Sequence, residues 1–328
     1  MTKTNQQKVK DFLINNGVII VMFILVIYTG FTSDNFFTKN NFMNILMNMS
    51  SRLVIALGIA GCVITAGCDL SAGRMIGFGA CISGMLLQRM DYSGKFFPDM
   101  QPLNVFVVAL IAMLVCAAFG TVTGFFIAYL NVPPFIATLA MMEIVYGIGL
   151  IVTNATPLGG YVEQYTNVSN GKFLGINYLI WIAIIVAAIT WFIFNMTRHG
   201  KYMYAIGGNP QAAEVAGVPV KATLILIYMK AAAMYGLAGF MLGAKAGGAS
   251  VQTGYGYEME AIAACTIGGV SVTGGRGKVS SAIIGVAVFE LLKVALQYLG
   301  MNANAQYIAI GVVIFIAISL DIRKYIAR

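Results

Sequence analysis

The chain has 328 residues, of which 59% are hydrophobic and 10% are charged, and its formal net charge at pH 7 is +8. Soluble domains carry about 25% charged residues, so this chain cannot cover itself with a polar surface. Its Lys and Arg residues stand in short clusters between apolar stretches of about 20 residues, the length of a membrane-spanning helix. The composition therefore excludes a soluble domain, and the distribution of basic residues excludes a nucleic-acid-binding face.

In chain order, the apolar stretches predict about ten membrane-spanning helices in one all-α, polytopic domain that takes in residues 1–328. The predicted spans are 13–31, 52–68, 72–90, 103–130, 134–154, 176–196, 222–246, 257–274, 279–298 and 305–321. The longest exceeds one bilayer crossing, so we expect it to tilt or break near Gly120 and Gly124. No small-residue cleavage site follows the first stretch, which is therefore predicted to be retained as a span.

The basic residues predict how the spans are oriented. With both termini in the cytoplasm, twelve Lys and Arg residues fall inside, six fall outside, and Lys230 and Lys293 fall within spans. This excess agrees with the positive-inside rule and requires an even number of spans. Arg74 is on the inner side of this arrangement, and Arg52 is on the outer side.

A short internal similarity surrounds Asp69. Gly67-Cys-Asp-Leu-Ser-Ala-Gly-Arg74 aligns without gaps on Gly269-Val-Ser-Val-Thr-Gly-Gly-Arg276, and Ser71 is matched by a Thr. We expect both segments to be Gly-rich cytoplasmic turns with an Arg at the membrane interface, and they hint at a duplicated half. Asp69 is expected to cap the third span, and a role in transmitting motion is the alternative.

The connection 198–221 contains the pattern of a short helix. Asn209 is a preferred N-cap residue, Pro210 suits the first helical position, and Gly217 suits the left-handed position that ends a helix. The residues between them would form about two turns, which is too short to be stable alone in water. Such a helix is either held by a partner that packs on it or is an ordinary interfacial turn.

This loop resembles the coupling loop of the permease subunits of bacterial ABC sugar importers, the family of ribose, xylose, arabinose and galactoside transporters. The family pattern A-x-G-G-N-x-x-A-A-x-x-(A/S)-G-(I/V) is present at Ala205, Gly207, Gly208, Asn209, Ala212, Ala213, Ala216, Gly217 and Val218. The resemblance extends over nearly the whole chain through Leu57–Gly61, Asp69–Arg74, Asn131–Phe135, Tyr257–Cys265 and Gly268–Ser271. Together with Leu87–Asp91 and Phe97–Met100, it is strongest to the galactose/methyl-galactoside branch.

The resemblance implies a set of partners. Two copies of the permease would form one path for a hexose through the inner membrane, and a periplasmic binding protein would deliver the sugar. A separate ATPase subunit would bind ATP and Mg²⁺. The residues implied to couple to that ATPase are Gly207, Gly208, Asn209, Ala212, Ala213, Glu214 and Gly217. Glu258 and Glu260 match the family too, and they would either anchor the eighth span or contact the binding protein.

The sequence offers no chemistry of its own. The string nearest to a phosphate-binding loop, Gly274–Ser281, lacks a Gly at position 272 and has Val279 where the motif needs a hydroxyl. The only histidine, His199, stands among cytoplasmic charges. The five cysteines include no CxxC pair, so we expect buried small side chains and neither disulfides nor zinc. We expect no catalytic residue, metal site or cofactor in this chain.

Charged residues within spans are costly and invite a functional explanation. Glu290 and Lys293 are three residues apart on one helix face, so they are expected to neutralise each other. Glu143 and Lys230 have no local partner, and an ion pair between their spans is a hypothesis. The candidates for a structural or translocation role are Asp69, Ser71, Arg74, Glu143, Lys230, Glu258, Glu260 and Glu290.

Two alternatives stay open at this level. Within the family, the solute could be glucose instead of a galactoside, or it could be ribose or another pentose. Outside it, deep charged residues would also suit an ion-coupled secondary transporter. A membrane-bound transferase is disfavoured, because no His or carboxylate constellation is expected at a membrane face.

Overall fold

The computed structural model describes residue 20 and residues 22–326, and nearly all of its regular structure is helical. The helices in chain order are Met22–Thr32, α2 (Lys39–Ile64), α3 (Ala72–Leu86), α4 (Val105–Tyr129), α5 (Pro134–Thr153), α6 (Glu163–Asn170), α7 (Tyr178–Met196), α8 (Arg198–Gly208), α9 (Pro210–Val215), α10 (Val220–Ala246), α11 (Tyr257–Ile267), α12 (Val279–Tyr298) and α13 (Ala303–Ile326). Strands β1 (Lys172–Phe173) and β2 (Ile176–Asn177) pair in one antiparallel hairpin. Apart from this short hairpin, the prediction of an all-α chain is confirmed.

Six of the described helices are long and apolar enough to cross a membrane, namely α2, α4, α5, α7, α10 and α12. The third and eighth predicted spans are shorter than predicted, since α3 has 15 residues and α11 has 11. The first predicted span, 13–31, lies partly outside the described residues. The count of ten full spans therefore stays a prediction.

One predicted boundary and one predicted break differ from the structure for identifiable reasons. α2 begins at Lys39, well before the predicted start at 52. Thr38 caps this start by accepting a hydrogen bond from the backbone N–H of Asn41. The prediction missed the start because the first turns of α2 carry polar residues. α4 does not break at Gly120 or Gly124. These glycines allow close contact instead, since a Cβ on either would meet the backbone of α10 within 2.7 Å.

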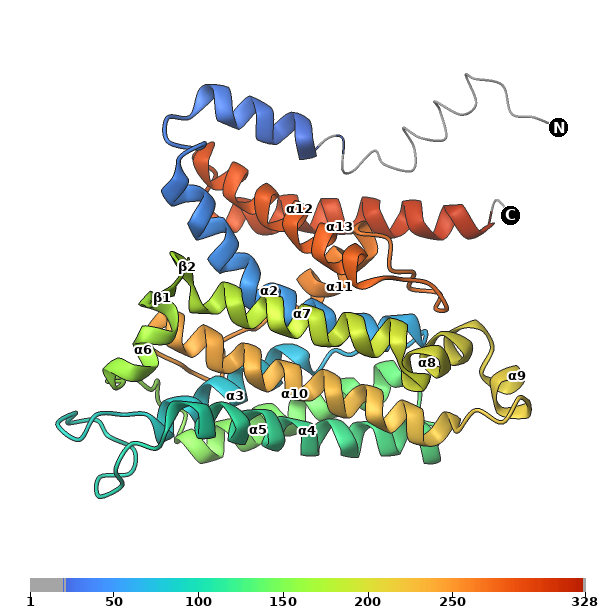
Figure 1. The fold of residues 1–328 in the computed structure, drawn as a ribbon, viewed down its shortest axis with the longest axis horizontal. Helices are drawn as coiled ribbons and strands as arrows, with labels where there is room; N and C mark the ends of the chain where they lie inside the picture. The colour runs from blue at the N-terminus through green and yellow to red at the C-terminus, as the bar shows by residue number, and fades with distance from the viewer. Residues whose placement is uncertain (1–19, 21, 327–328) are drawn as a thin grey trace.

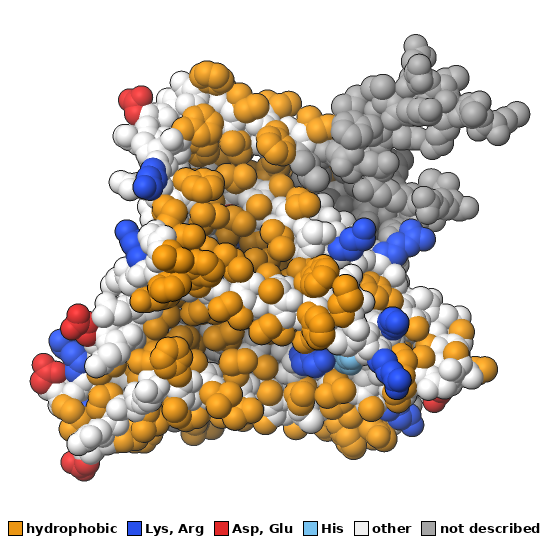
Figure 2. All heavy atoms as spheres, in the orientation of Figure 1, with side chains coloured by type: hydrophobic (Ala, Val, Ile, Leu, Met, Phe, Trp, Pro, Cys, Tyr) orange, Lys and Arg blue, Asp and Glu red, His pale blue; other side chains and the backbone are white. Residues whose placement is uncertain are grey.

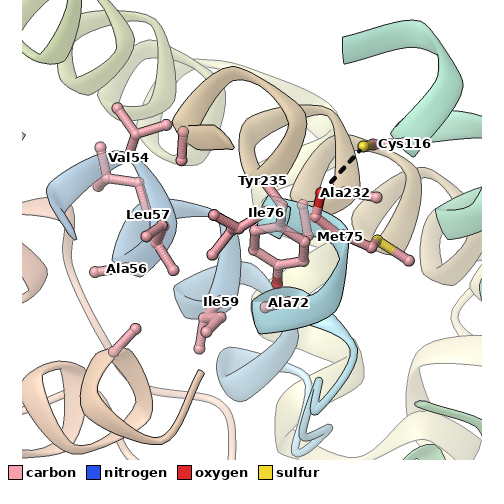
Figure 3. Packing of buried hydrophobic residues seen from close by; sticks show 14 of the residues in the cluster. Val54, Ala56, Leu57, Ile59, Ala72, Met75, Ile76, Cys116, Ala232 and Tyr235 are labelled. Carbon is pink, nitrogen blue, oxygen red and sulfur yellow. Dashed lines mark hydrogen bonds between the residues drawn. The ribbon is translucent and has the colours of Figure 1, made fainter. Parts of the chain in front are cut away.

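Helix α10 is the centre of the packing. It lies against α4, α3 and α2, and its buried Tyr235 and Ala232 pack among side chains of α2 and α3 (Figure 3). Gly236 and Gly239 allow the neighbouring backbones to approach, because a Cβ at Gly239 would lie 2.2 Å from the carbonyl oxygen of Ile76. Small residues at helix crossings give membrane bundles their close packing.

Two loops return from the ends of long helices to the middle of the fold. After α2 ends, residues 65–71 turn back until the hydroxyl of Tyr235, near the middle of α10, donates to Asp69 (3.2 Å), and α3 starts there. After α10 ends at the opposite side, residues 247–256 turn back until Gly254 packs on Ile76, and α11 starts there. The chain therefore contains two interrupted helices whose N-termini meet in the interior.

The two ends of the molecule differ in composition from its middle. Figure 1 places α8 and α9 at one end and α6 with the β-hairpin at the other. Figure 2 shows hydrophobic side chains over the middle of the visible face and charged side chains gathered towards both ends. This distribution is the one expected of helices that cross a bilayer with their ends in water.

The contact at Gly239 predicts a stability difference between two glycines. We expect Gly239→Ala to destabilise the protein by about 1–3 kcal/mol, because the added Cβ overlaps backbone atoms that cannot rotate away. Gly147→Ala on α5 is the matched control, since a Cβ there meets nothing within 4 Å. Thermal unfolding in detergent measures both, and equal midpoints for the two variants would contradict this account of the crossing.

Candidate functional site

The helices α8 and α9 form a projecting unit at one end of the molecule (Figure 1). Asn209 caps α9 by accepting a hydrogen bond from the backbone N–H of Ala212 (2.9 Å). Gly217 ends it with a φ of +83°, and Val218 donates back to the carbonyl of Ala213 (3.0 Å). The predicted short helix is thus confirmed with its cap and its terminator. The sequence did not reveal α8, which precedes it.

The predicted coupling residues divide into exposed and buried groups. Gly208, Asn209, Ala212, Glu214 and Gly217 are exposed. Gly207 and Ala213 are buried. Gly207 lies so close to the carbonyl of Ile64 that a Cβ would stand 1.8 Å from that oxygen. Gly207 therefore fixes α8 against the end of α2, whereas α9 is held only at Ala213 and shows its remaining surface to the outside.

The single histidine lies at the base of this unit. His199 lines a small cavity with Phe194, Met203 and Lys230. Burial and the nearby ammonium group of Lys230 lower the pKa of His199 to about 4, so its imidazole is neutral at physiological pH. The sequence placed His199 among cytoplasmic charges, and its neighbours Arg198 and Lys201 are exposed, but its own side chain is half-buried beside Lys230 of α10.

Four charged side chains form a charge network between α2, α11 and α12. Arg52 contacts Glu260 (2.6 Å) and Glu290 (3.0 Å), and Lys293 contacts Glu260 (2.5 Å). Two positive and two negative groups balance. The spacing predicted that Glu290 and Lys293 pair with each other. Among the described ion pairs they do not, because Glu290 pairs with Arg52 of α2 and Lys293 pairs with Glu260 of α11. Of the two roles predicted for Glu260, the network supports that of an anchor.

The hypothesis of an ion pair between Glu143 and Lys230 is wrong. Glu143 is exposed on α5, and Lys230 faces the cavity of His199. The ion pairs formed by the described residues do not include one between them. Residue spacing within one segment could not show that the pair is absent, because this depends on which helices are neighbours. α5 packs on α3 and α4 instead of α10.

Asp69 and Ser71 form a buried turn in front of α3. One carboxylate oxygen of Asp69 accepts hydrogen bonds from the backbone N–H of Ser71 (3.0 Å) and from its hydroxyl (2.6 Å). The other accepts from Tyr235 (3.2 Å). Asp69 does not cap α3, because Ser71 holds the cap position and makes no side-chain capping bond. Its role is to fix the returning loop against α10.

Arg74 and Glu258 lie where the two interrupted helices meet. Arg74 donates to Gln252 (2.8 Å), and its guanidinium stacks between the rings of Tyr146 and Tyr255, at 3.9 and 4.6 Å from their centroids. Glu258 is buried against Gly73. The prediction of Arg74 at the cytoplasmic interface was wrong. Arg74 contacts the loop that follows α10, and this loop leaves the end of α10 opposite to α8 and α9.

The two segments of the internal similarity do not occupy equivalent positions in the fold. Residues 67–74 lead into α3 in the interior, whereas 269–276 follow α11 and reach Gly207 and Ile64 beside α8. Gln252, Tyr146 and Tyr255 were missed by sequence reasoning, because the contact joins three distant segments and no local pattern marks it.

Two further expectations concern cysteines and metals. The predicted burial holds for Cys62, Cys81, Cys116 and Cys265, whereas Cys68 is half-buried. Within residues 22–326, no group of three or more His, Cys, Asp or Glu side chains is placed to hold a metal ion.

The sequence of this helical membrane protein matches a known family. Residues 41–318 match the family described as the permease component of the branched-chain amino acid transport system. The chain belongs to this family, so it is the multi-pass inner-membrane permease of an ABC importer, a class that works with an ATPase and a periplasmic binding protein.

Its named relatives are sugar permeases. The galactose/methyl galactoside import permease MglC of Escherichia coli K12 is 39% identical, and that of Haemophilus influenzae is 40% identical, each with 99% of both chains covered. The ribose import permease RbsC of Escherichia coli K12 is 32% identical with 96% of both chains covered. No solved structure matches the chain.

The charge network predicts a large cost for removing Arg52. Arg52→Gln leaves Glu260 and Glu290 without their shared partner, and breaking a buried pair costs about 3–5 kcal/mol. Arg89→Gln is the matched control, because its pair with Asp91 is exposed and such pairs contribute about 0–1 kcal/mol. Unfolding by SDS in mixed micelles measures both free energies.

The double variant Arg52→Gln with Glu290→Gln separates charge from packing. It restores part of the lost stability if the cost comes from the unpaired carboxylate of Glu290. A double variant no more stable than the single variant would show that Arg52 acts only through its packing.

Proposed function

We propose that this chain forms the membrane path of an ATP-driven importer for galactose and methyl galactosides. The observation that carries the proposal is the similarity to galactose/methyl galactoside permeases over 99% of both chains, together with a capped, projecting α9. The more distant ribose permeases make a pentose the weaker alternative. In this proposal a binding protein selects the sugar, and the path needs only weak contacts with it.

The helix α9 is the proposed place where the energy of ATP enters. It has six residues, and isolated helices of this length are unstable in water, so a packing partner is expected. Val215 is 91% exposed on it, so it offers such a partner an apolar side chain. We propose that a separate ATPase supplies this groove and that ATP and Mg²⁺ bind to that subunit alone.

The proposed topology keeps ten crossings with both termini in the cytoplasm. α13 ends on the same side of the molecule as α8 and α9 (Figure 1). Arg52 and Arg74 lie in the interior and no longer count for either side, and the remaining basic residues number eleven inside and five outside. The positive-inside rule is therefore still obeyed, with α3 and α11 as interrupted crossings completed by their returning loops.

The opposite end is proposed to receive the binding protein. It carries α6, the hairpin β1–β2 and residues 88–103, all of which lie away from α9 (Figure 1). Exposed Asp91, Asp99 and Glu163 give this surface acidic groups. A second copy of the permease is proposed to complete the path.

The docking proposal predicts that the ATPase is lost when α9 is altered. We expect a stoichiometric ATPase to co-purify with the chain from its native membrane, and we expect scrambling of 209–217 to remove it. The point variant Glu214→Lys should weaken the association at least about tenfold, as loss of a charged contact in a desolvated interface costs about 1.4 kcal/mol or more. Quantitative pull-down of the ATPase measures both.

The matched control is Glu163→Lys on α6, another exposed glutamate on a short helix but at the opposite end. It should leave ATPase binding unchanged. A scrambled 209–217 segment that still retains the ATPase would place the docking surface elsewhere.

The substrate proposal predicts sugar uptake with a particular energy source. Cells that express the chain with its ATPase and binding protein should accumulate labelled galactose, and methyl galactoside should compete while ribose should not. Uptake should persist when a protonophore is added and ATP is maintained. Competition by ribose would move the substrate to the pentoses, and sensitivity to the protonophore would favour an ion-coupled secondary transporter.

A further inference from the structure

The loop 247–256 carries exposed, non-helical backbone at an unusual depth. It reaches back from the end of α10 until Gly254 touches Gly73 and Ile76, beside the middle of α10. Gln252 and Tyr255 are exposed on it, the latter to 63%. Irregular backbone at membrane depth is tolerated only where it is buried in protein or lines a water-filled cavity. This side of the loop therefore does not face lipid.

The side chains around this loop form a compact polar cluster, which we define as Arg74, Tyr146, Gln252, Tyr255 and Glu258. Gln252 accepts from Arg74 (2.8 Å) and donates to the hydroxyl of Tyr146 (3.0 Å). The guanidinium stacks on both tyrosine rings. Helices α3, α5 and α11 and the loop before α11 each contribute to the polar cluster, so it spans the junction of four segments.

Hydrogen-bonding capacity is left unused inside the polar cluster. Glu258 is only 6% exposed, and its Oε2 atom has no hydrogen-bond partner. The Nε atom of Arg74 is also buried without one. Buried polar atoms usually have partners, and those without one call for an explanation such as a ligand or water. An unpaired donor on Arg74 and an unpaired acceptor on Glu258 therefore lie in the same polar cluster.

The first turns of α3 and α11 add to this capacity. Ser71, at the cap position of α3, makes no side-chain capping bond, and the cap position of α11 is Gly256, which has no side chain to make one. The early N–H groups of both helices carry partial positive charge and point towards the junction. Glycine at position 73 is required there, because a Cβ would come within 2.0 Å of Oε2 of Glu258.

We propose that this polar cluster is the place where the sugar contacts the permease in the middle of the membrane. The inference rests on the proposed function, and it names the site within it. Aromatic ring faces suit the C–H faces of a neutral hydroxylated ring. Arg74, Gln252 and Glu258 supply a donor, an amide and an acceptor for its hydroxyls. Without sugar, Arg74 lies over both tyrosine rings, and a passing sugar replaces Gln252 and Tyr146 as its partners.

Cysteine accessibility tests whether the polar cluster faces water. Gln252→Cys and Tyr255→Cys should react with a membrane-impermeant sulfonated methanethiosulfonate reagent in the intact complex with ATPase and binding protein, and galactose should slow the reaction. Leu110→Cys on α4 is the matched control. Leu110 has an exposed fraction similar to that of Tyr255 but lies on the surface of an apolar helix, where lipid is expected to keep the reagent away. The unsubstituted chain reports the reactivity of its own five cysteines.

Transport assays test whether the polar cluster touches the sugar. Arg74→Lys and Tyr255→Ala should each lower galactose imported per ATP hydrolysed at least about tenfold, because the first variant removes the planar guanidinium and the second removes a ring face. A purely structural role would instead lower the amount of folded complex. If Arg74→Lys does not fold, the exposed Tyr255 still provides the test.

The outcomes separate the site from the function. Unreactive cysteines together with an unchanged ratio of sugar to ATP in these variants would overturn the site while the unsubstituted complex still imports galactose. A complex that imports no galactose at all would overturn the proposed function itself.

Discussion

The structure depends on one constraint, which is that polar backbone inside a membrane must find partners within the protein. Two helices are interrupted here, so the loops 65–71 and 247–256 bring free backbone groups and charged side chains into the interior. Asp69 and Tyr235 fasten the first loop, and the charge network around Arg52 fastens the start of α11. Glycines at the crossings let the backbones come close enough for these bonds to form. Without such fastenings the interrupted helices would expose unpaired groups to lipid.

The sequence predicted local features better than long-range ones. The cap and terminator of α9 were found because Asn209, Pro210 and Gly217 act on neighbouring backbone atoms. The all-α character followed from apolar length alone. The depth of Arg52 and Arg74 was not found, because a window of hydropathy measures how apolar a segment is and not how far it reaches. Loop 65–71 is itself apolar enough to pass for the end of a span.

The candidate site shows the same division between local and distant signals. The family pattern in 198–221 marked the coupling loop, but it could not separate exposed Asn209 from buried Gly207, which requires the position of Ile64. Arg74 and Glu258 were candidates individually. Their shared surroundings with Gln252 and two tyrosines depend on how α3, α5 and α11 are packed, and no spacing within one segment encodes that arrangement.

The two functional regions are joined by a short stretch of chain. Gly207 of α8 lies against Ile64, and Gly275 donates to the carbonyl of Ile64 (2.8 Å). Residues 65–71 continue from this point to the bond between Asp69 and Tyr235, and α3 then presents Arg74 to the polar cluster. A displacement of α8 by a docked ATPase would therefore act on a loop that carries its own hydrogen bonds into the interior. Because packed interfaces have discrete arrangements, such a shift would favour switching between two positions of α3 over gradual bending. Coupling between the regions therefore requires that both bias this same element, α3 with its returning loop.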